Sequence, residues 1–196
     1  MPPADDAVEG EWDPWENPEA GHRHEGFFLR LSFGFGFGSI GGGDALSTGT
    51  AVDFSGGAAG GSFAIGGTIA GALSLHVDFF FSRLLNPAVE RGRRDYDYGD
   101  PGIGAAGLGA TYHFANNVYV GLSGGLASVN WERQTGEVSE SEAGLGGHAI
   151  VGKEWWVDPD WGVGIAVQAI MAEAADPFYE TVSVQAYHLL LSATYN

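Results

Sequence analysis

The stretch from Phe27 to Gly38, FFLRLSFGFGFG, constrains the fold more than any other part of the chain. Its odd positions are all large and apolar, whereas its even positions from Arg30 onward are Arg, Ser or Gly. Side chains alternate between the two faces of a strand. The stretch therefore predicts a strand with one large apolar face and one face of small or polar residues, because a helix would scatter the apolar groups around its axis.

Eight segments with this alternation follow one another after the first 26 residues. They are predicted at 27–38, 62–70, 72–81, 102–112, 118–128, 143–152, 161–171 and 182–195. Their connections alternate in length: long ones at 38–61, 82–101, 129–142 and 172–181, and short ones near Gly71, at 113–117 and at 153–160. An even number of strands with this asymmetry predicts an all-β, eight-stranded antiparallel up-and-down transmembrane barrel, with both termini on the short-turn side.

Charged residues are nearly absent from the eight segments. Apart from segment ends they are Arg30 and Asp78, both on the small, polar face, and no charge occurs between Asp100 and Glu132. That uncharged stretch is long enough for a transmembrane helix. Residues 113–117 divide it, however, and both halves alternate with period two, which favours two strands and a turn.

The apolar and the polar face of the predicted strands could be turned inward or outward. A soluble ligand-binding barrel of the lipocalin type would turn its apolar face inward. Its outer face would then consist of Gly, Ser, Ala and Thr, which confers little solubility. Lipid on the apolar face suits the composition better, since a closed barrel pairs every backbone group and leaves no edge. The side chains predicted to face lipid include Phe33, Phe35, Phe37, Leu75, Phe79, Leu122, Ile165, Leu189 and Leu191.

Aromatic residues gather at the segment ends. The set is Phe27, Phe79 to Phe81, Tyr112, Phe114, Trp155, Trp156, Trp161, Tyr187 and Tyr195. Trp and Tyr favour the headgroup level of a bilayer, so the set predicts two interfacial girdles.

With these features, residues 27–196 resemble the small eight-stranded outer-membrane barrels of Gram-negative bacteria, of the OmpX, OmpW and OmpA-barrel type. The last strand in that class ends in an aromatic residue after alternating apolar positions, and this serves as an assembly signal. Tyr187, Leu189, Leu191, Ala193 and Tyr195 match the alternation, although Asn196 adds one residue beyond the aromatic. The resemblance implies a monomer in the outer membrane with periplasmic termini. Its implied partners are membrane lipid, lipopolysaccharide and the outer-membrane assembly machinery.

The first 26 residues form a separate acidic tail. They contain eight acidic residues and four prolines, which predicts a disordered periplasmic segment. The chain opens without the basic and apolar regions of a secretory signal, so we expect a mature form whose signal is absent. The formal net charge of −17 excludes a nucleic-acid partner, and the absence of cysteine excludes disulfides and thiolate sites.

The polar face predicts a network inside the barrel. Its members are Arg30, His76, Asp78, Tyr119, His148, Gln168, His188 and Gln185 or one of its neighbours. A buried Arg and Asp require partners, and Arg30 with Asp78 is the leading predicted pair. Structural filling of the lumen is the favoured interpretation. The inward glycines keep a narrow polar pore open as the alternative.

Enzymatic and metal sites are not predicted. His76 and Asp78 point the same way about 6–7 Å apart, as a lipid A-modifying enzyme could use, yet no serine has a fixed relation to them. Asp95, Asp97 and Asp100 lack the full calcium-loop pattern, and the pair His22 and His24 lacks fixed geometry. Arg91, Arg93 and Arg94 could instead contact lipopolysaccharide. The sequence thus predicts a non-enzymatic outer-membrane barrel without cofactors, of structural, adhesive or small-solute channel type.

Overall fold

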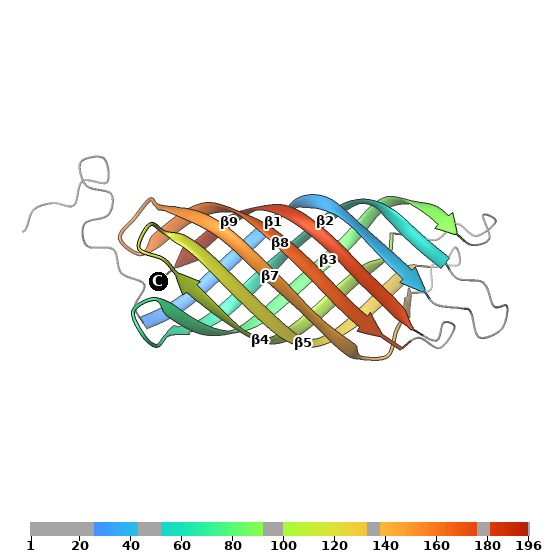
Figure 1. Cartoon of the computed structure of the whole chain (residues 1–196), viewed down its shortest axis with the longest axis horizontal. Coiled ribbons are helices and arrows are strands. Elements are labelled where there is room, and N and C mark those ends of the chain that lie inside the picture. Colours follow the sequence, from blue (N-terminus) through green and yellow to red (C-terminus); the bar gives the residue numbers. More distant parts are fainter. Residues whose placement is uncertain (1–25, 43–51, 92–99, 133–137, 176–180, 196) are drawn as a thin grey trace, which may run out of the picture.

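A computed structural model describes residues 26–42, 52–91, 100–132, 138–175 and 181–195. It contains eight long strands and one short one (Figure 1). The strands are β1 (Gly26–Gly42), β2 (Val52–Thr68), β3 (Leu73–Arg91), β4 (Gly102–His113), β5 (Val118–Glu132), β6 (Val138–Glu140), β7 (Gly144–Trp156), β8 (Trp161–Ala174) and β9 (Val182–Tyr195). No helix that is long and apolar enough to cross a membrane occurs among the described residues.

The eight long strands close into an antiparallel ring. Each pairs with its neighbours in the chain, β1 pairs with β9, and β6 adds a short pairing to the end of β5. Following the paired residues once round the ring from Leu29 returns to β1 at Ser39, ten residues further along. With a rise of about 3.3 Å per residue and about 4.8 Å between strands, this offset tilts the strands by about 40°. The predicted eight-stranded up-and-down barrel is confirmed.

The two ends of the barrel differ. At one end, here the turn end, short connections of residues 69–72, 114–117 and 157–160 join the strands, and Gly26 and Tyr195 lie there as well (Figure 1). Gly71 and Asn117 have φ values of 56° and 59°, which tight turns require and which Gly and Asn adopt most readily. The opposite end, here the loop end, has the other four connections.

Five strands, β1, β2, β3, β5 and β8, reach further toward the loop end than predicted, and one strand was not predicted. β1 runs to Gly42, β2 begins at Val52 rather than Ser62, and β3 runs to Arg91. Residues 52–61 are mostly Gly and Ala, so they show no alternation of large side chains, yet their backbone pairs with both neighbours. The three-residue β6 is too short to give a periodic signal.

The outer surface carries an apolar band. All nine side chains predicted to face lipid lie on it, with exposed fractions between 47% for Phe79 and 72% for Leu191. The outward apolar run of β8 spans Trp161 to Met171, which gives a band about 25 Å tall at the tilt above. This height matches the hydrocarbon-facing band of a membrane barrel. A soluble barrel with an apolar interior face is excluded by this arrangement.

Aromatic rings mark the edges of the band. At the turn end the Tyr195 ring centroid lies 6.0 Å from that of Phe27 and 5.3 Å from that of Trp161, and Tyr112 packs on Phe114. Phe37 and Tyr187 meet at 5.4 Å toward the loop end. Three predicted girdle residues are placed differently. Phe80 points into the barrel and is buried, because its even position lies on the inner face of β3. Phe79 and Phe81 face outward but lie within the band, because β3 continues as far as Arg91.

Candidate functional site: the lumen

The lumen contains most of the polar residues predicted for it. Arg30, His76, Asp78, Tyr119, His148, Gln168 and His188 all point inward and are buried, with exposed fractions of 4% or less. Gln185 is the exception. It is exposed on the outer face of β9, while its neighbours Val184 and Ala186 point inward, so no polar group enters the lumen there.

Asp78 is the centre of one hydrogen-bonded cluster. Its Oδ2 atom accepts from Ser123 Oγ at 2.6 Å and from His148 Nε2 at 2.8 Å. The other imidazole nitrogen, Nδ1 of His148, lies 2.9 Å from Gln168 Nε2. With Gln168 donating to Nδ1, His148 carries its proton on Nε2 and donates it to Asp78. Four side chains from β3, β5, β7 and β8 thus meet across the lumen.

Arg30 belongs to a second cluster closer to the turn end. Its Nη2 atom donates to Thr111 Oγ1 at 3.1 Å, and the same oxygen lies 3.1 Å from His76 Nε2. The guanidinium carbon lies 4.7 Å from the Tyr119 ring centroid and 5.5 Å from that of Phe28. Cation–π contacts of this kind stabilise a guanidinium that is removed from water.

The predicted pair between Arg30 and Asp78 does not form. Neither a hydrogen bond nor an ion pair joins them, and Arg30 Nε and Nη1 and Asp78 Oδ1 have no hydrogen-bond partner. Asp78 lies on β3, two strands from β1, and its carboxylate turns across the lumen to His148. Between the two clusters stands His76, whose Nδ1 atom is 3.8 Å from Asp78 Oδ2.

A third polar group at the turn end was not predicted. Glu154 is buried and accepts a hydrogen bond from Thr194, and its Oε2 atom lies 4.0 Å from Nε2 of the buried His113. Both Glu154 and His113 fall in predicted turns, whereas β7 continues through Glu154 and β4 ends at His113. An extension of the period-two pattern by one residue on β4 and by two residues on β7 would have placed both on the inner face.

The inward glycines leave room for large polar side chains. A Cβ atom built on Gly60 would lie 2.5 Å from His188 Nε2, and one on Gly109 would lie 2.5 Å from His76 Cε1. Gly152 is likewise covered by the Tyr119 ring, at 2.5 Å from Cζ. The small inner face therefore serves close packing.

The loop-end part of the lumen is apolar, which was not predicted. Inward side chains from β1, β2, β3, β4, β5, β8 and β9 pack there into one buried cluster, here the apolar layer. Its members are Ile40, Phe54, Ala58, Phe80, Leu84, Ile103, Ala127, Val129, Ile170, Ala172, Val182, Val184 and Ala186. The sequence contains a signal for this layer in runs where neighbouring positions are both apolar, so that one of them points inward. Examples are Phe79-Phe80-Phe81 and Leu84-Leu85.

Comparisons with known proteins agree with this architecture. The crystal structure of Neisserial surface protein A (NspA) superposes with a TM-score of 0.53 at 17% identity, over 86% of this chain and 96% of that one. The chain has the fold of a small outer-membrane β-barrel. Ail, the attachment invasion locus protein of Yersinia pestis, gives a TM-score of 0.45 at 13% identity, over 87% and 99% of the two chains. The outer membrane protease OmpT of Escherichia coli gives 0.44 at 11%, over 88% and 97%.

No family model and no curated protein matches the sequence. The likeness therefore concerns the fold alone, and a function must be argued from the lumen and the surface of this barrel.

Ser123, His76 and Asp78 are not arranged as a serine–histidine–acid triad. Ser123, the serine nearest to the predicted His76 and Asp78, donates to the carboxylate rather than to an imidazole. A nucleophilic serine needs the histidine as its base, with the acid behind that histidine. All three side chains are also buried inside the barrel.

Metal-binding groups of three or more His, Asp or Glu side chains are not found among the described residues. Several residues named in the sequence analysis lie outside the described residues. They are Asp95, Asp97, Arg93, Arg94, the tail with His22 and His24, Asn196 and the side chain of Arg91. Asp100 is described, and its Oδ1 atom accepts from the backbone N–H of Asn86 at 2.9 Å.

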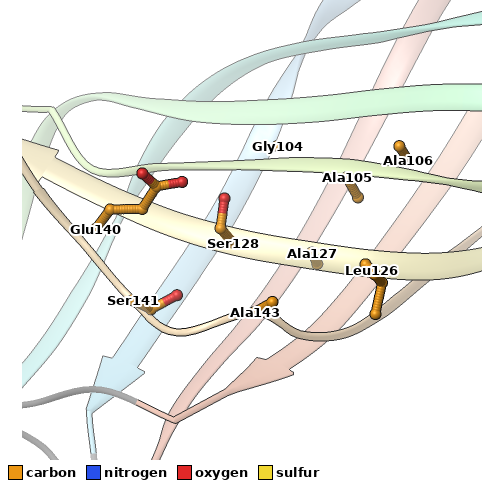
Figure 2. Close-up of a pocket in the computed structure, with 9 residues that line it drawn as sticks. All are labelled: Gly104, Ala105, Ala106, Leu126, Ala127, Ser128, Glu140, Ser141 and Ala143. Carbon is orange, nitrogen blue, oxygen red and sulfur yellow. The ribbon is translucent and has the colours of Figure 1, made fainter.

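The outer surface has shallow depressions near the loop end. Figure 2 shows one of them over β4, β5 and the segment that follows β6. It is lined by Gly104, Ala105, Ala106, Leu126, Ala127, Ser128, Glu140, Ser141 and Ala143. Glu140 contributes a carboxylate to this depression.

Proposed function

We propose that this chain is an integral outer-membrane barrel, non-enzymatic and closed to solutes, with a structural or adhesive role. Its turn end and both termini face the periplasm, and its loop end faces the exterior. Lipopolysaccharide and membrane lipid surround it, the outer-membrane assembly machinery inserts it, and it acts as a monomer. The apolar layer is the observation that carries this proposal.

The apolar layer is a barrier to ions and polar solutes. A hydrated solute that entered from the turn end would meet the polar clusters first and then Phe80, Leu84 and Ile170, each 1% exposed. Crossing such a layer requires loss of most of the hydration shell, because the polar side chains that lie among it, Ser82 and His188, bond to each other. This favours the structural or adhesive alternative over the channel.

The strands that extend beyond the band support an outward-facing role. β1, β2 and β3 stay paired as far as Gly42, Val52 and Arg91, several residues past the boundary of the apolar band. They form a paired three-stranded extension beyond the band, with irregular register between β2 and β3 near Asp53 and Ser55. A barrel with a filled lumen and such an extension suits contact with other surfaces better than transport.

Conductance of the full chain in planar lipid bilayers tests this function. We expect no single-channel steps from protein that shows heat-modifiable gel mobility, which reports a folded barrel. Steady steps from the folded protein would overturn the closed-barrel proposal.

The non-enzymatic part has a separate test. Expression of the chain in a Gram-negative host should leave the mass spectrum of lipid A unchanged. A modified lipid A that disappears in the His76→Ala variant would show instead that the barrel is a lipid-modifying enzyme.

A further inference from the structure

The outer surface has a second hollow near the loop end, over β7, β8 and β9. These three strands pair with one another in this order and lie side by side in Figure 1. The hollow is lined by residues 145–147, 171–173 and 183–185. Its exposed side chains are those of Leu145, Met171, Glu173, Ser183 and Gln185. The hollow therefore contains both apolar and polar groups.

The hollow crosses the loop-end boundary of the apolar band. Met171 is the last apolar outward residue of β8, and Glu173 is the next outward residue toward the loop end. The register places Gln185 opposite Met171 and Ser183 opposite Glu173. Lipid headgroups lie at the boundary of such a band, and acyl chains lie against the band itself. The polar side of the hollow is thus at the level of a headgroup.

Three hydrogen-bond acceptors meet on the polar side. Glu173 and Ser183 lie opposite each other with Cβ atoms about 4.5–5.5 Å apart, and Gln185 is the diagonal neighbour of Glu173 at about 7–8 Å. In the described part of the chain, none of these side chains forms a hydrogen bond or an ion pair. A primary ammonium has three N–H donors. The carboxylate, amide and hydroxyl oxygens can therefore accept from one ammonium together.

The charge of the hollow favours an amine over a phosphate. Its lining contains one carboxylate and no Lys, Arg or His. Phosphate recognition relies on Arg or Lys, whereas Lys153 lies toward the opposite end of β7 and donates to the backbone of Asn116. At the membrane boundary water screens charges less than in bulk solution, so attraction between the Glu173 carboxylate and an ammonium is stronger there.

The depression in Figure 2 lacks this arrangement. Its carboxylate belongs to Glu140, which lies opposite Asn130, four residues beyond Leu126, the last apolar outward residue of β5. This places Glu140 further from the band than Glu173. The hydroxyl of Ser141 in that depression is already engaged in hydrogen bonds with the backbone.

We propose that the hollow over β7, β8 and β9 binds one membrane lipid whose headgroup carries a primary amine. The ammonium lies among Glu173, Ser183 and Gln185, and the first part of an acyl chain lies against Leu145 and Met171. The inference rests on the proposed membrane location. It adds a preference for one class of lipid that a closed barrel does not by itself require.

Native mass spectrometry of the full chain in a neutral detergent tests the site. The probes are phosphatidylethanolamine and phosphatidylglycerol with identical acyl chains, of which only the first carries an amine. The wild type should retain one phosphatidylethanolamine at least several-fold more often than phosphatidylglycerol. Glu173→Gln keeps the shape of the side chain but removes its charge, and it should reduce this preference at least several-fold. Heat-modifiable gel mobility shows that the variant is folded.

A matched variant separates the site from a general effect of charge. Glu140→Gln removes the same charge from the depression in Figure 2 and should keep the wild-type preference. An unchanged preference in Glu173→Gln, or an equal loss in Glu140→Gln, would overturn the inference.

A soluble headgroup tests whether the ligand is a lipid. Glycerophosphoethanolamine has the same amine without acyl chains and should not displace phosphatidylethanolamine at equal concentration. Displacement would show that the hollow binds a free amine, which would overturn the lipid assignment. A barrel that conducts ions but keeps the lipid preference would overturn the proposed function and leave the lipid site standing. A silent barrel without the preference would do the reverse.

Discussion

His148 Nε2 lies 2.8 Å from Asp78 Oδ2, and this contact joins two opposite walls of the barrel through buried side chains. Asp78 accepts its other hydrogen bond from the neutral hydroxyl of Ser123. A buried carboxylate that loses its main donor keeps the cost of its desolvation without the compensating bond. The stability of the barrel should therefore depend strongly on this pair.

The first prediction concerns His148→Ala. We expect it to lower the free energy of unfolding by about 3–5 kcal/mol, the loss that follows when a buried charge, here the Asp78 carboxylate, is left without its partner. Urea unfolding in lipid vesicles measures the change. His188→Ala is the matched control, because His188 is also buried but bonds only to the neutral Ser82 at 3.1 Å, and it should cost about 1–3 kcal/mol. Equal losses in the two variants would contradict a special role for the Asp78 contact.

The second prediction concerns the closure of the barrel between β1 and β9. A Cβ atom on Gly36 would collide with the carbonyl oxygen of Tyr187 and would lie 2.7 Å from the Cα atom of His188. Since these are backbone atoms, Gly36→Ala should force the two strands apart and cost at least about 1–3 kcal/mol. The yield of the heat-modifiable band after refolding measures this. Gly57→Ala, which meets no atom, should refold as the wild type does, and a normal yield from Gly36→Ala would disprove the close approach.

The sequence specifies the strands and their outer faces because one physical constraint acts on every strand. Lipid requires an apolar side chain at each outward position, so the period-two signal is strong from Phe27 to Tyr195. The part of β2 formed by residues 52–61 was not predicted, because its small side chains show no such alternation. The inner face obeys a weaker rule, since polar and apolar groups can both fill a lumen if they pack. The apolar layer around Phe80 therefore could not be read from alternation alone.

The partners within the lumen depend on geometry that no local pattern contains. Which residues meet across the barrel follows from the ten-residue offset that accumulates around the ring. A polar inner face suggested that Arg30 and Asp78 would pair, but the offset brings His148 and Ser123 to Asp78 and Thr111 to Arg30. Prediction of a polar lumen was thus possible, and prediction of its pairs was not.

The third prediction places the barrier to conduction in the apolar layer. The double variant Phe80→Ser with Ile170→Ser removes two of its large inward side chains and should give single-channel steps in planar bilayers where the wild type is silent. Phe79→Ser with Met171→Ser changes the adjacent outward residues and should stay silent. If the inward variant is folded by gel mobility and still silent, the barrier lies elsewhere in the lumen.

The fourth prediction tests the height of the apolar band on a single strand. Leu122 and Ser128 both lie on the outer face of β5, the first in the middle of the band and 69% exposed, the second at its loop-end boundary. An arginine costs about 2–4 kcal/mol at the middle of a membrane barrel and about 0–1 kcal/mol near the interface. Leu122→Arg should therefore lower the free energy of unfolding in vesicles by the larger amount and Ser128→Arg by the smaller. The same pair in detergent micelles should differ less, because micelles adapt to a charged side chain. A Ser128→Arg loss as large as that of Leu122→Arg would place the boundary of the band further toward the loop end than the outward side chains indicate.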